Sequence, residues 1–348
     1  MKKIILGFIA STLFSFNVLA ESIALQTDHP SEYTVKRGDT LWDISSTFLR
    51  EPWLWPEIWH INRQIKNPHL IYPGDVIKLV YVNGEPRLVL ASASGGTRSA
   101  SNGTEKLLPR VRSTPIETVI PAIPLDAVRG FLDESRVLDK ETLQKAPYVV
   151  AGNEKHVIIG AGDYFYARGD WSAPAPAYGV YRQGAPYVDP VTQEILGYDA
   201  KELGMGKIIT VTDDLAKTEL VRSRQELRVN DRLLPTEERK VQPVFYPSTP
   251  DEDLKGQIIR VMSGVKNVAQ YDVVVINQGI REGVEEGNVF AIYRKGESVR
   301  DKNTKELLQL PSERAGLLMV FRTFDKVSYG LVLKATSSMA VLDEVRKP

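Results

Sequence analysis

The chain has 348 residues, with 44 lysines and arginines against 44 aspartates and glutamates, and 43% of its residues are hydrophobic. This length suits roughly two to three domains. Because the charges balance, the chain has no net positive charge with which to attract nucleic acid. The absence of cysteine excludes disulfides, thiolate metal sites and thiol nucleophiles. The four histidines are too few and too scattered for most zinc-hydrolase sites. We therefore expect no nucleic-acid partner, no cofactor and no bound metal.

Residues 1–20 have the composition of a secretory signal peptide. Two lysines precede a mostly apolar run over 4–16, and Ala20 is the small residue after which cleavage is expected. The alternative, an uncleaved membrane anchor, needs about 20 apolar residues, whereas polar residues interrupt this shorter run. We expect a mature chain that begins at Glu21, is periplasmic or otherwise exported, is soluble and wall-associated, and has no membrane span.

The composition changes near residue 82, which indicates a domain boundary. Four of the five tryptophans lie within 33–79, whereas 91–104 is a Gly/Ser-rich tract with no large side chain to bury. After several prolines, apolar residues recur at helical spacing between Asp126 and Leu132. We predict a first domain over 30–82, a flexible linker over 83–120 and a short helical lead-in over 121–146.

From about residue 147 onward, short apolar or alternating runs are separated by Gly, Pro and Asp, a spacing typical of a β-barrel or sandwich. Two segments recur at an offset of 112 residues. Tyr-Arg-Gln-Gly at 181–184 returns as Tyr-Arg-Lys-Gly at 293–296, and Asp-x-x-Thr-x-Glu-Ile-Leu at 189–196 returns as Asp-x-x-Thr-x-Glu-Leu-Leu at 301–308. We therefore predict a mainly-β region made of two copies of one small β domain, at 147–240 and 250–348.

A strand, two helices and a second strand are predicted within residues 33–79. After an alternating strand, Gly38 allows a tight turn, and Thr40 with Asp43 fits the capping box that starts a helix. A proline in its first turn suits a second helix. Ile-Tyr-Pro-Gly-Asp at 71–75 predicts a turn into a returning apolar strand. The order β-α-α-β indicates a small α+β domain.

These segments resemble a known family, the lysin motif or LysM domain. The resemblance rests on Tyr-Thr-Val-Lys-Arg-Gly-Asp-Thr-Leu-Trp at 33–42, on Asn62 and on Ile-Tyr-Pro-Gly-Asp at 71–75. It implies binding of N-acetylglucosamine-containing glycans, chiefly peptidoglycan or chitin, in a shallow groove between two loops. On this sequence, the resemblance places those loops at Gly38, Asp39, Thr40 and Leu41 and at Asn67, Pro68, His69, Leu70 and Ile71.

The chemistry of these loops agrees with such a ligand. An acetamido group needs backbone donors and acceptors at close range and an apolar surface for its methyl group, which a Gly-containing turn beside Leu41, Leu70 and Ile71 can offer. Residues 50–55 depart from a short LysM domain by enlarging the connection between the helices. Trp53 and Trp55 in this connection are either a stacking platform for a sugar or part of a small core; we favour the core.

A catalytic function was tested against the residues present. Wall peptidases that use cysteine are excluded, and zinc hydrolases need several histidines in one domain, whereas His156 is the only one after residue 69. A glycosidase or lytic transglycosylase needs only carboxylates, for which Asp163, Asp170 and Asp189 are the candidates. The competing interpretation is that such aspartates cap turns.

The layout as a whole also resembles a group of exported bacterial LysM proteins with an uncharacterised C-terminal part. We predict a non-catalytic cell-envelope protein that binds peptidoglycan or a related glycan through its LysM domain. Its duplicated β module would be presented to an envelope protein that the sequence does not identify. The alternative is a peptidoglycan-cleaving glycosidase or lytic transglycosylase that uses a carboxylate of the β region.

Overall fold

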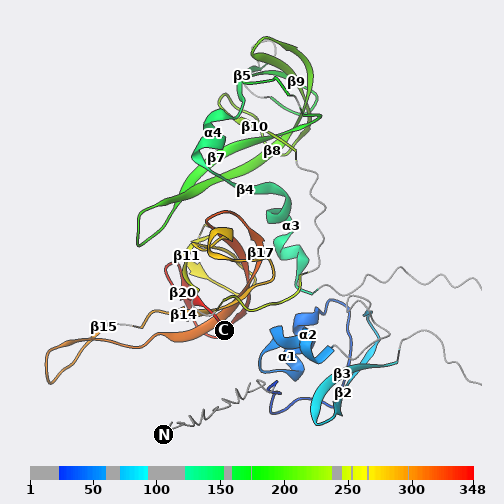
Figure 1. Ribbon diagram of the computed structural model, residues 1–348, viewed down its shortest axis with the longest axis vertical. Coiled ribbons are helices and arrows are strands. Elements are labelled where there is room, and N and C mark those ends of the chain that lie inside the picture. The colour runs from blue at the N-terminus through cyan, green and yellow to red at the C-terminus, as the bar shows by residue number, and fades with distance from the viewer. Residues whose placement is uncertain are drawn as a thin grey trace, which may run out of the picture.

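The computed structural model describes residues 23–59, 71–92, 122–152, 159–173, 175–236, 245–251, 254–264, 266–296 and 298–348. The expected signal peptide, most of the expected linker and the loop residues Asn67, Pro68, His69 and Leu70 lie outside these residues. Among the helices in the described ranges, none is long and apolar enough to cross a membrane. Figure 1 shows a small N-terminal domain beside one β unit, with a second β unit at the other end of the long axis.

The N-terminal domain has a three-stranded antiparallel sheet with short helices. Its elements are β1 (Glu32–Thr34), α1 (Leu41–Phe48), the 3-10 helix η1 (Pro52–Leu54), α2 (Trp55–Trp59), β2 (Val76–Val82) and β3 (Glu85–Ser92). β2 pairs with β1 on one side and with β3 on the other. Leu41, Ile44 and Phe48 lie on the buried face of α1, at the helical spacing of the sequence. The predicted order β-α-α-β is confirmed, and β3 is an additional strand.

The expected start of the linker at residue 83 is wrong, because β3 occupies the segment that follows. Asn83 and Gly84 have positive φ angles of 54° and 85°, the backbone of a two-residue type I′ hairpin turn. β3 then pairs with β2 along its whole length, and Leu88 is fully buried. An Asn-Gly pair between two apolar runs is a known hairpin signal, and the Asn-Gly pair at 83–84 forms the turn of this hairpin.

The lead-in is only partly helical. Helical spacing between Asp126 and Leu132 is confirmed by α3 (Leu125–Glu134). The chain continues as β4 (Ser135–Leu138), which was not predicted, and as α4 (Lys140–Lys145), whose N-cap is Asp139. β4 forms because it pairs antiparallel with a strand far along the chain, a contact that local sequence cannot reveal.

The first β unit, barrel 1, consists of β5 (Tyr148–Gly152), β6 (Tyr164–Arg168), β7 (Tyr178–Val188), β8 (Ile195–Thr212), β9 (Leu215–Ser223) and β10 (Arg232–Pro235). These strands follow the order β8-β7-β10-β5-β6-β9, and β8 also pairs with β9, which closes the ring. β4 adds to the outer part of β8. The long strands β7 and β8 extend beyond the ring as a hairpin.

The second β unit, barrel 2, is a closed barrel of β11 (Lys255–Val261), β13 (Val273–Ile276), β18 (Ser328–Ala335), β17 (Glu313–Thr323), β14 (Val289–Arg294) and β20 (Glu344–Arg346), in that order. Three smaller elements complete it: a pair of β12 (Asn267–Val268) with β19 (Met339–Ala340), the 3-10 helix η3 (Ile280–Glu282), and a hairpin of β15 (Ser298–Arg300) with β16 (Leu307–Gln309). The expectation of a mainly-β region after the N-terminal domain is confirmed.

Barrel 2 is buried on both faces of four strands. Its interior contains alternate residues of β13, β14, β17 and β18, among them Val274, Phe290 and Leu318. The residues between them point outward and are also buried, because the N-terminal domain, α3 and the β7–β8 hairpin cover this outer face. The covering side chains are Trp42, Trp53, Ile123, Val128, Tyr187 and Leu196. Burial on both faces explains why these strands are continuous apolar runs rather than alternating ones.

Candidate functional site

The loop after β1 is built from a glycine turn and a helix cap. Gly38 has a φ of 95°, which a glycine adopts without strain. Asp39 Oδ2 accepts hydrogen bonds from the backbone N–H of Lys36 at 2.8 Å and from the Tyr33 hydroxyl at 3.0 Å. Burial and then the hydrogen bond to Asp39 raise the pKa of Tyr33, so this phenol stays a donor. Asp39 therefore fixes the turn.

Thr40 starts α1 through the predicted capping box. Its hydroxyl accepts from the Asp43 backbone N–H at 3.1 Å, and Asp43 Oδ2 accepts from the Thr40 backbone N–H at 3.1 Å. Both donors belong to the free N–H groups at a helix start. The loop therefore reaches the helix with a fixed geometry.

The turn before β2 lies against the end of β1. Asp75 Oδ2 accepts from the Tyr72 backbone N–H at 3.0 Å, which closes the turn. The Val35 N–H donates to the Asp75 carbonyl at 2.9 Å, and the Gly74 N–H donates to the Val35 carbonyl at 2.8 Å. These backbone bonds hold the end of β1, just before the first predicted loop, against the turn that follows the second predicted loop.

The described loop residues differ in what they offer a ligand. Gly38 is exposed and Asp39 is half-buried, whereas Thr40, Leu41 and Ile71 are buried. Leu41 and Ile71 pack in the core of the N-terminal domain, so their side chains do not provide the apolar surface that the sequence suggested. At Leu41 and Ile71, the groups that the loops can offer a ligand are therefore backbone groups.

Trp53 and Trp55 are both buried. Trp53 is 6% exposed and packs on the outer face of barrel 2, with the Arg314 guanidinium 5.5 Å from its ring centre. Trp55 is 1% exposed in the core of the N-terminal domain. Neither ring has an open face on which a sugar could stack in this arrangement.

Barrel 2 contains an exposed tyrosine, missed by sequence reasoning, whose ionisation responds to a charge of helix α1 in the N-terminal domain. Tyr271, at the turn before β13, is 43% exposed and has a φ of 68°. Its pKa is raised by burial and then by the negative charge of Asp43, a residue of α1. No local signal in the sequence connects the two positions, because the proximity arises from packing between domains.

The three candidate catalytic carboxylates are bound to the backbone of their own turns. Asp163 accepts from the Gly160 N–H at 2.8 Å, and Asp170 accepts from the Ser172 N–H at 2.9 Å. Asp189 accepts from the N–H groups of Val191 and Thr192, and from the side-chain amide of Asn277.

The ionisation of Asp170 and Asp189 does not favour a general acid. Burial raises the pKa of Asp189, but its hydrogen bonds outweigh burial and hold the pKa below the ordinary value. The hydrogen bonds from Ser172 lower the pKa of Asp170. A general acid must be protonated at working pH, which a lowered pKa opposes. In the described ranges, no group of three or more His, Asp or Glu side chains is arranged to hold a metal ion.

Comparison with known proteins identifies the N-terminal domain. Residues 33–80 match the sequence model of the LysM domain. Over 60 residues, the chain is 40% identical to the uncharacterized protein YqbP of Bacillus subtilis (strain 168), an alignment that covers 14% of this chain and 27% of that protein. The chain thus spans about a quarter of the length of the curated relative that it matches. Residues 33–80 of this protein are a LysM domain.

Proposed function

We propose that this protein binds N-acetylglucosamine-containing glycan, above all peptidoglycan, through its LysM domain. The observation that carries the proposal is the LysM match over residues 33–80. The hydrogen bonds that join the end of β1 to the turn before β2 support it, because they hold the chain just before the first predicted loop against the turn that follows the second. The ligand would lie between residues 38–41 and 67–71.

Titration of chitin oligosaccharides into the full chain tests the binding function directly. We expect saturable binding of oligomers of N-acetylglucosamine and none of glucose oligomers of equal length, because only the former carry the acetamido group. Equal binding of both would contradict the proposal.

The protein would act without cleaving the glycan. Support comes from the three carboxylates Asp163, Asp170 and Asp189, which are engaged as turn caps. Incubation of the full chain with purified peptidoglycan should release no soluble muropeptides. Release that is lost in an Asp163→Asn, Asp170→Asn or Asp189→Asn variant would establish the alternative, a wall-cleaving enzyme.

Export to the cell envelope is part of the same proposal. It is supported by the signal-like composition of residues 1–20 and by the location of peptidoglycan itself. N-terminal sequencing of protein from envelope fractions should give Glu21 as the first residue. Protein that still begins at Met1 would mean an uncleaved segment.

The two barrels would be copies of one unit, within residues 147–240 and 250–348. Their strand orders correspond, β5-β6-β9-β8-β7-β10 to β11-β13-β18-β17-β14-β20. Four shifts of strand register in barrel 1 also have a counterpart in barrel 2. The matched positions are Val149/Ala151 with Ile258/Arg260, Val180/Tyr181 with Ile292/Tyr293, Met205/Gly206 with Leu317/Leu318, and Ile208/Thr210 with Val320/Arg322. Since bulges are specific local features, this agreement supports duplication.

A further inference from the structure

Each barrel carries one projecting hairpin at the same place in its topology. In barrel 1 the projection is residues 186–198, the outer ends of β7 and β8, here called the first arm. In barrel 2 it is residues 298–310, which include β15 and β16, here called the second arm. The two arms are related by the offset of 112 residues that the sequence repeat shows.

The first arm is docked on barrel 2 through apolar contacts. Tyr187 and Leu196 are 1% and 6% exposed and belong to the cluster on the outer face of barrel 2. The Tyr187 hydroxyl lies 3.3 Å from that of Tyr329, and the Arg260 guanidinium lies 4.2 Å from the centre of the Tyr187 ring. Arg260 also donates to the Pro186 carbonyl at 3.0 Å.

Polar contacts fix the register of this docking. Asn277 Nδ2 donates to Asp189 Oδ2 at 2.7 Å. Glu194 Oε1 lies 2.6 Å from Lys326 Nζ and 3.1 Å from Arg281 Nη1. The acceptor surface of barrel 2, formed by Arg260, Asn277, Arg281, Lys326 and Tyr329, is thus an apolar and aromatic floor flanked by an amide donor and cations.

The second arm has the same turn as the first. Asp301 Oδ1 accepts from the N–H groups of Asn303 and Thr304 at 2.6 and 3.3 Å, as Asp189 does from Val191 and Thr192 at 2.9 and 2.8 Å. The next residues, Lys305 and Gln193, have φ angles of 61° and 62°. Asp301 and Glu306 therefore occupy the places of Asp189 and Glu194, the two acids with which the first arm docks.

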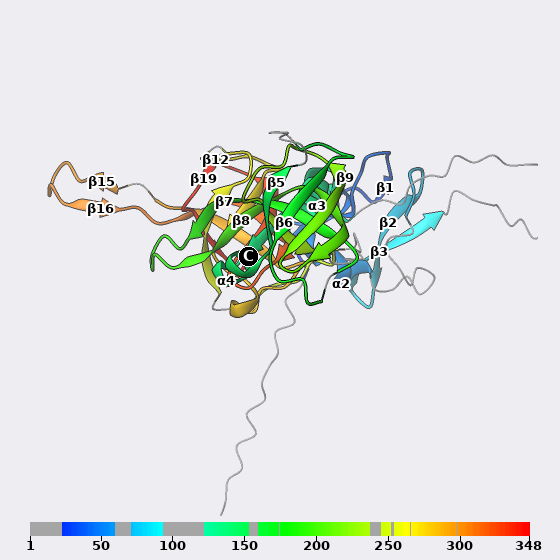
Figure 2. The ribbon, with the colours of Figure 1, turned by 90° about the horizontal axis from the view of Figure 1, so that it is seen from above.

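Unlike the first arm, the second arm is exposed on its apolar side. Leu308, the equivalent of Leu196, is 44% exposed, and Leu307 is 68% exposed. Val299 and Leu310 are also exposed. In both Figure 1 and Figure 2 the β15–β16 hairpin projects away from the body of the protein, and no helix or strand of the described residues lies alongside it. Exposed apolar residues gathered on a two-stranded hairpin, which is marginally stable by itself, are typical of an interaction surface.

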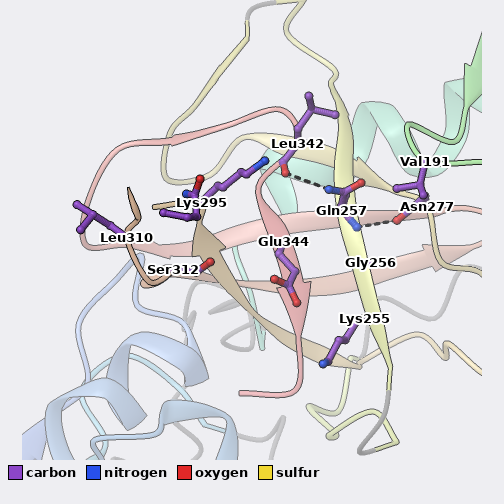
Figure 3. A pocket seen from close by; sticks show the side chains of 11 residues that line it. Val191, Lys255, Gly256, Gln257, Asn277, Lys295, Leu310, Ser312, Leu342 and Glu344 are labelled. Atoms are coloured by element: carbon purple, nitrogen blue, oxygen red, sulfur yellow. Dashed lines mark hydrogen bonds between the residues drawn. The ribbon is translucent and has the colours of Figure 1, made fainter. Parts of the chain in front are cut away.

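A hollow of about 430 Å³ continues this surface at the base of the second arm. Figure 3 shows Leu310 and Lys295 on one side of it and Gln257 of β11 on the other, with Leu342 between them. Val191, at the tip of the first arm, also lines the hollow. Leu310 and Leu342 are 45% and 52% exposed, so the hollow has apolar side chains next to polar ones such as Lys295 and Gln257.

In another copy of this chain, the acceptor surface of barrel 2 is occupied, and the corresponding surface of barrel 1 has different side chains at the contact positions. The acceptor surface of barrel 2 is already covered by the first arm. In barrel 1, strand pairing places Lys217 where barrel 2 has Tyr329, and the sequence offset of 112 places Asp214 where it has Lys326. Asp214 is already paired with Arg168 at 2.6 Å, so the cation of that surface is engaged within its own barrel. Lys217 replaces the aromatic ring against which the first arm packs in barrel 2.

We propose that the second arm is a docking element for a different protein, one that presents an apolar floor flanked by basic side chains, as barrel 2 does for the first arm. The inference rests on the proposed duplication and is independent of glycan binding. Leu308 and Val299 would enter the apolar floor, and Glu306 would pair with the partner's cations.

The chain itself supplies the probe for this recognition. Tyr187→Ser with Leu196→Ser in the full chain undocks the first arm and uncovers the acceptor surface of barrel 2. We expect the wild type to sediment as a monomer and this variant to associate head to tail, because the second arm of one molecule can enter the uncovered surface of the next. Adding Glu306→Lys and Leu308→Ser should weaken the association about tenfold or more.

The matched control is Val229→Ser, which removes a comparably exposed apolar side chain, 58% exposed, from barrel 1; the association should not change. If the double variant loses its β-sheet circular dichroism, Glu194→Lys uncovers the surface instead, by repelling Arg281 and Lys326. Three results would overturn the proposal: no association of the uncovered variants, association that ignores the changes in the second arm, or a wild type that dimerises through this arm.

The partner is then sought in the producing cell with a photo-crosslinking residue at position 308 of the full chain and, as a control, at 229. We expect a crosslink to another protein from position 308 alone, lost in Glu306→Lys, with the crosslinked peptide containing Lys or Arg beside apolar residues. Crosslinks only between copies of this chain, or only to an acidic surface, would contradict the proposal.

Discussion

Trp53 lies at the junction between the LysM domain and barrel 2, where the Arg314 guanidinium covers its ring. Arg314 also lies 3.4 Å from the Glu51 carboxylate, next to η1. A tryptophan in this place holds two domains together by apolar burial, and it has no free face for a ligand. The enlarged connection at residues 50–55 is therefore best understood as the part of the LysM domain that is adapted to its neighbour.

Replacing Trp53 should separate stability from binding. Trp53→Ala should lower the free energy of unfolding of the full chain by about 3–5 kcal/mol, as for other buried tryptophans. Below the melting transition, affinity for chitin oligosaccharides should stay at the wild-type value. Tyr81→Ala, which removes an exposed aromatic side chain of β2, is the control and should change neither. A stable Trp53→Ala variant with weak glycan binding would restore the stacking interpretation.

Leu70 is the position at which we test the predicted groove by mutation, because Leu41 and Ile71 are core residues. Leu70→Asp should weaken binding of chitin oligosaccharides by about 1–3 kcal/mol, since an apolar contact is replaced by a hydrated charge. Calorimetric titration gives the affinity, and a thermal melt shows whether the domain is intact. Val82→Asp, an equal change at an exposed position of β2, should bind as the wild type does. Wild-type affinity in Leu70→Asp would place the glycan elsewhere.

At the scale of elements, a buried arginine adds hydrogen bonds to the apolar packing of α3 on barrel 2. Arg322 of β17 is 4% exposed, and its guanidinium donates to the carbonyl oxygens of Phe131 and Leu132 at 2.8 and 3.0 Å and to that of Ser135. These carbonyls belong to the free acceptors at a helix C-terminus, where a cation is also favoured by the helix dipole. The contact joins α3, the start of β4 and barrel 2.

Arg322→Met should therefore cost about 2–3 kcal/mol of unfolding free energy, because buried carbonyls lose a charged donor. Denaturant unfolding measures the loss, and hydrogen exchange should show faster opening of α3. Arg129→Met, which removes an arginine from the exposed side of α3, is the control. Equal stability of the two variants would mean that the arginine contacts contribute nothing to this attachment.

Docking of the first arm should depend on pH through Glu194. The hydrogen bonds from Lys326 and then Arg281 lower the pKa of Glu194. A group with a lowered pKa stabilises the folded state above its unfolded pKa, about 4.3 for glutamate, and this contribution is lost as the pH falls through the lower folded value. The stability difference between wild type and Glu194→Gln should therefore shrink on acidification below about pH 4.

Glu306→Gln is the matched control, because Glu306 occupies the same place in the undocked second arm. Its stability difference from wild type should stay near zero across the whole pH range. Urea unfolding of the three proteins at a series of pH values gives both differences. A Glu194→Gln difference that grows on acidification would contradict the assigned ion pairs.

Local elements of this chain could be predicted from sequence where their signals are local. The capping box of Thr40 and Asp43, the helical spacing of α3 and the alternating runs of barrel 1 are all within a few residues, and each formed as expected. β4 could not be predicted, because its pairing partner in β8 lies in a distant segment. β3 could have been, from the Asn83-Gly84 turn.

Burial between domains could not be predicted from the sequence either, because the residues in contact are far apart along the chain. Tyr187 and Leu196 lie in a polar hairpin that looks like a surface loop, and only the packing on barrel 2 explains them. In the same way, Trp42 and Trp53 were assignable to a core but not to this junction. The residues of the predicted glycan loops rest on resemblance and stay a prediction, whereas the effect of the Asp43 charge on Tyr271 required the three-dimensional arrangement.

In the molecule as a whole, barrel 2 is the element against which the others pack. The LysM domain, α3 and the first arm each cover part of its outer face, which leaves the second arm as the projecting apolar element (Figure 1). The LysM domain is consequently tested best in the full chain, where Trp42 and Trp53 keep their partners. Under the proposed function, one end of the molecule holds the wall and the second arm recruits another protein.

Co-sedimentation of the full chain with purified peptidoglycan, at low and at moderate salt, tests the central claim most directly. Residues 33–79 contain six basic and five acidic residues, so binding by shape and hydrogen bonds should survive salt that screens charge attraction. We expect the wild type and Leu308→Ser to pellet equally at both salt concentrations, and Leu70→Asp to remain largely in solution. Pelleting that disappears at moderate salt, or that is the same for Leu70→Asp and wild type, would contradict glycan recognition by the LysM groove.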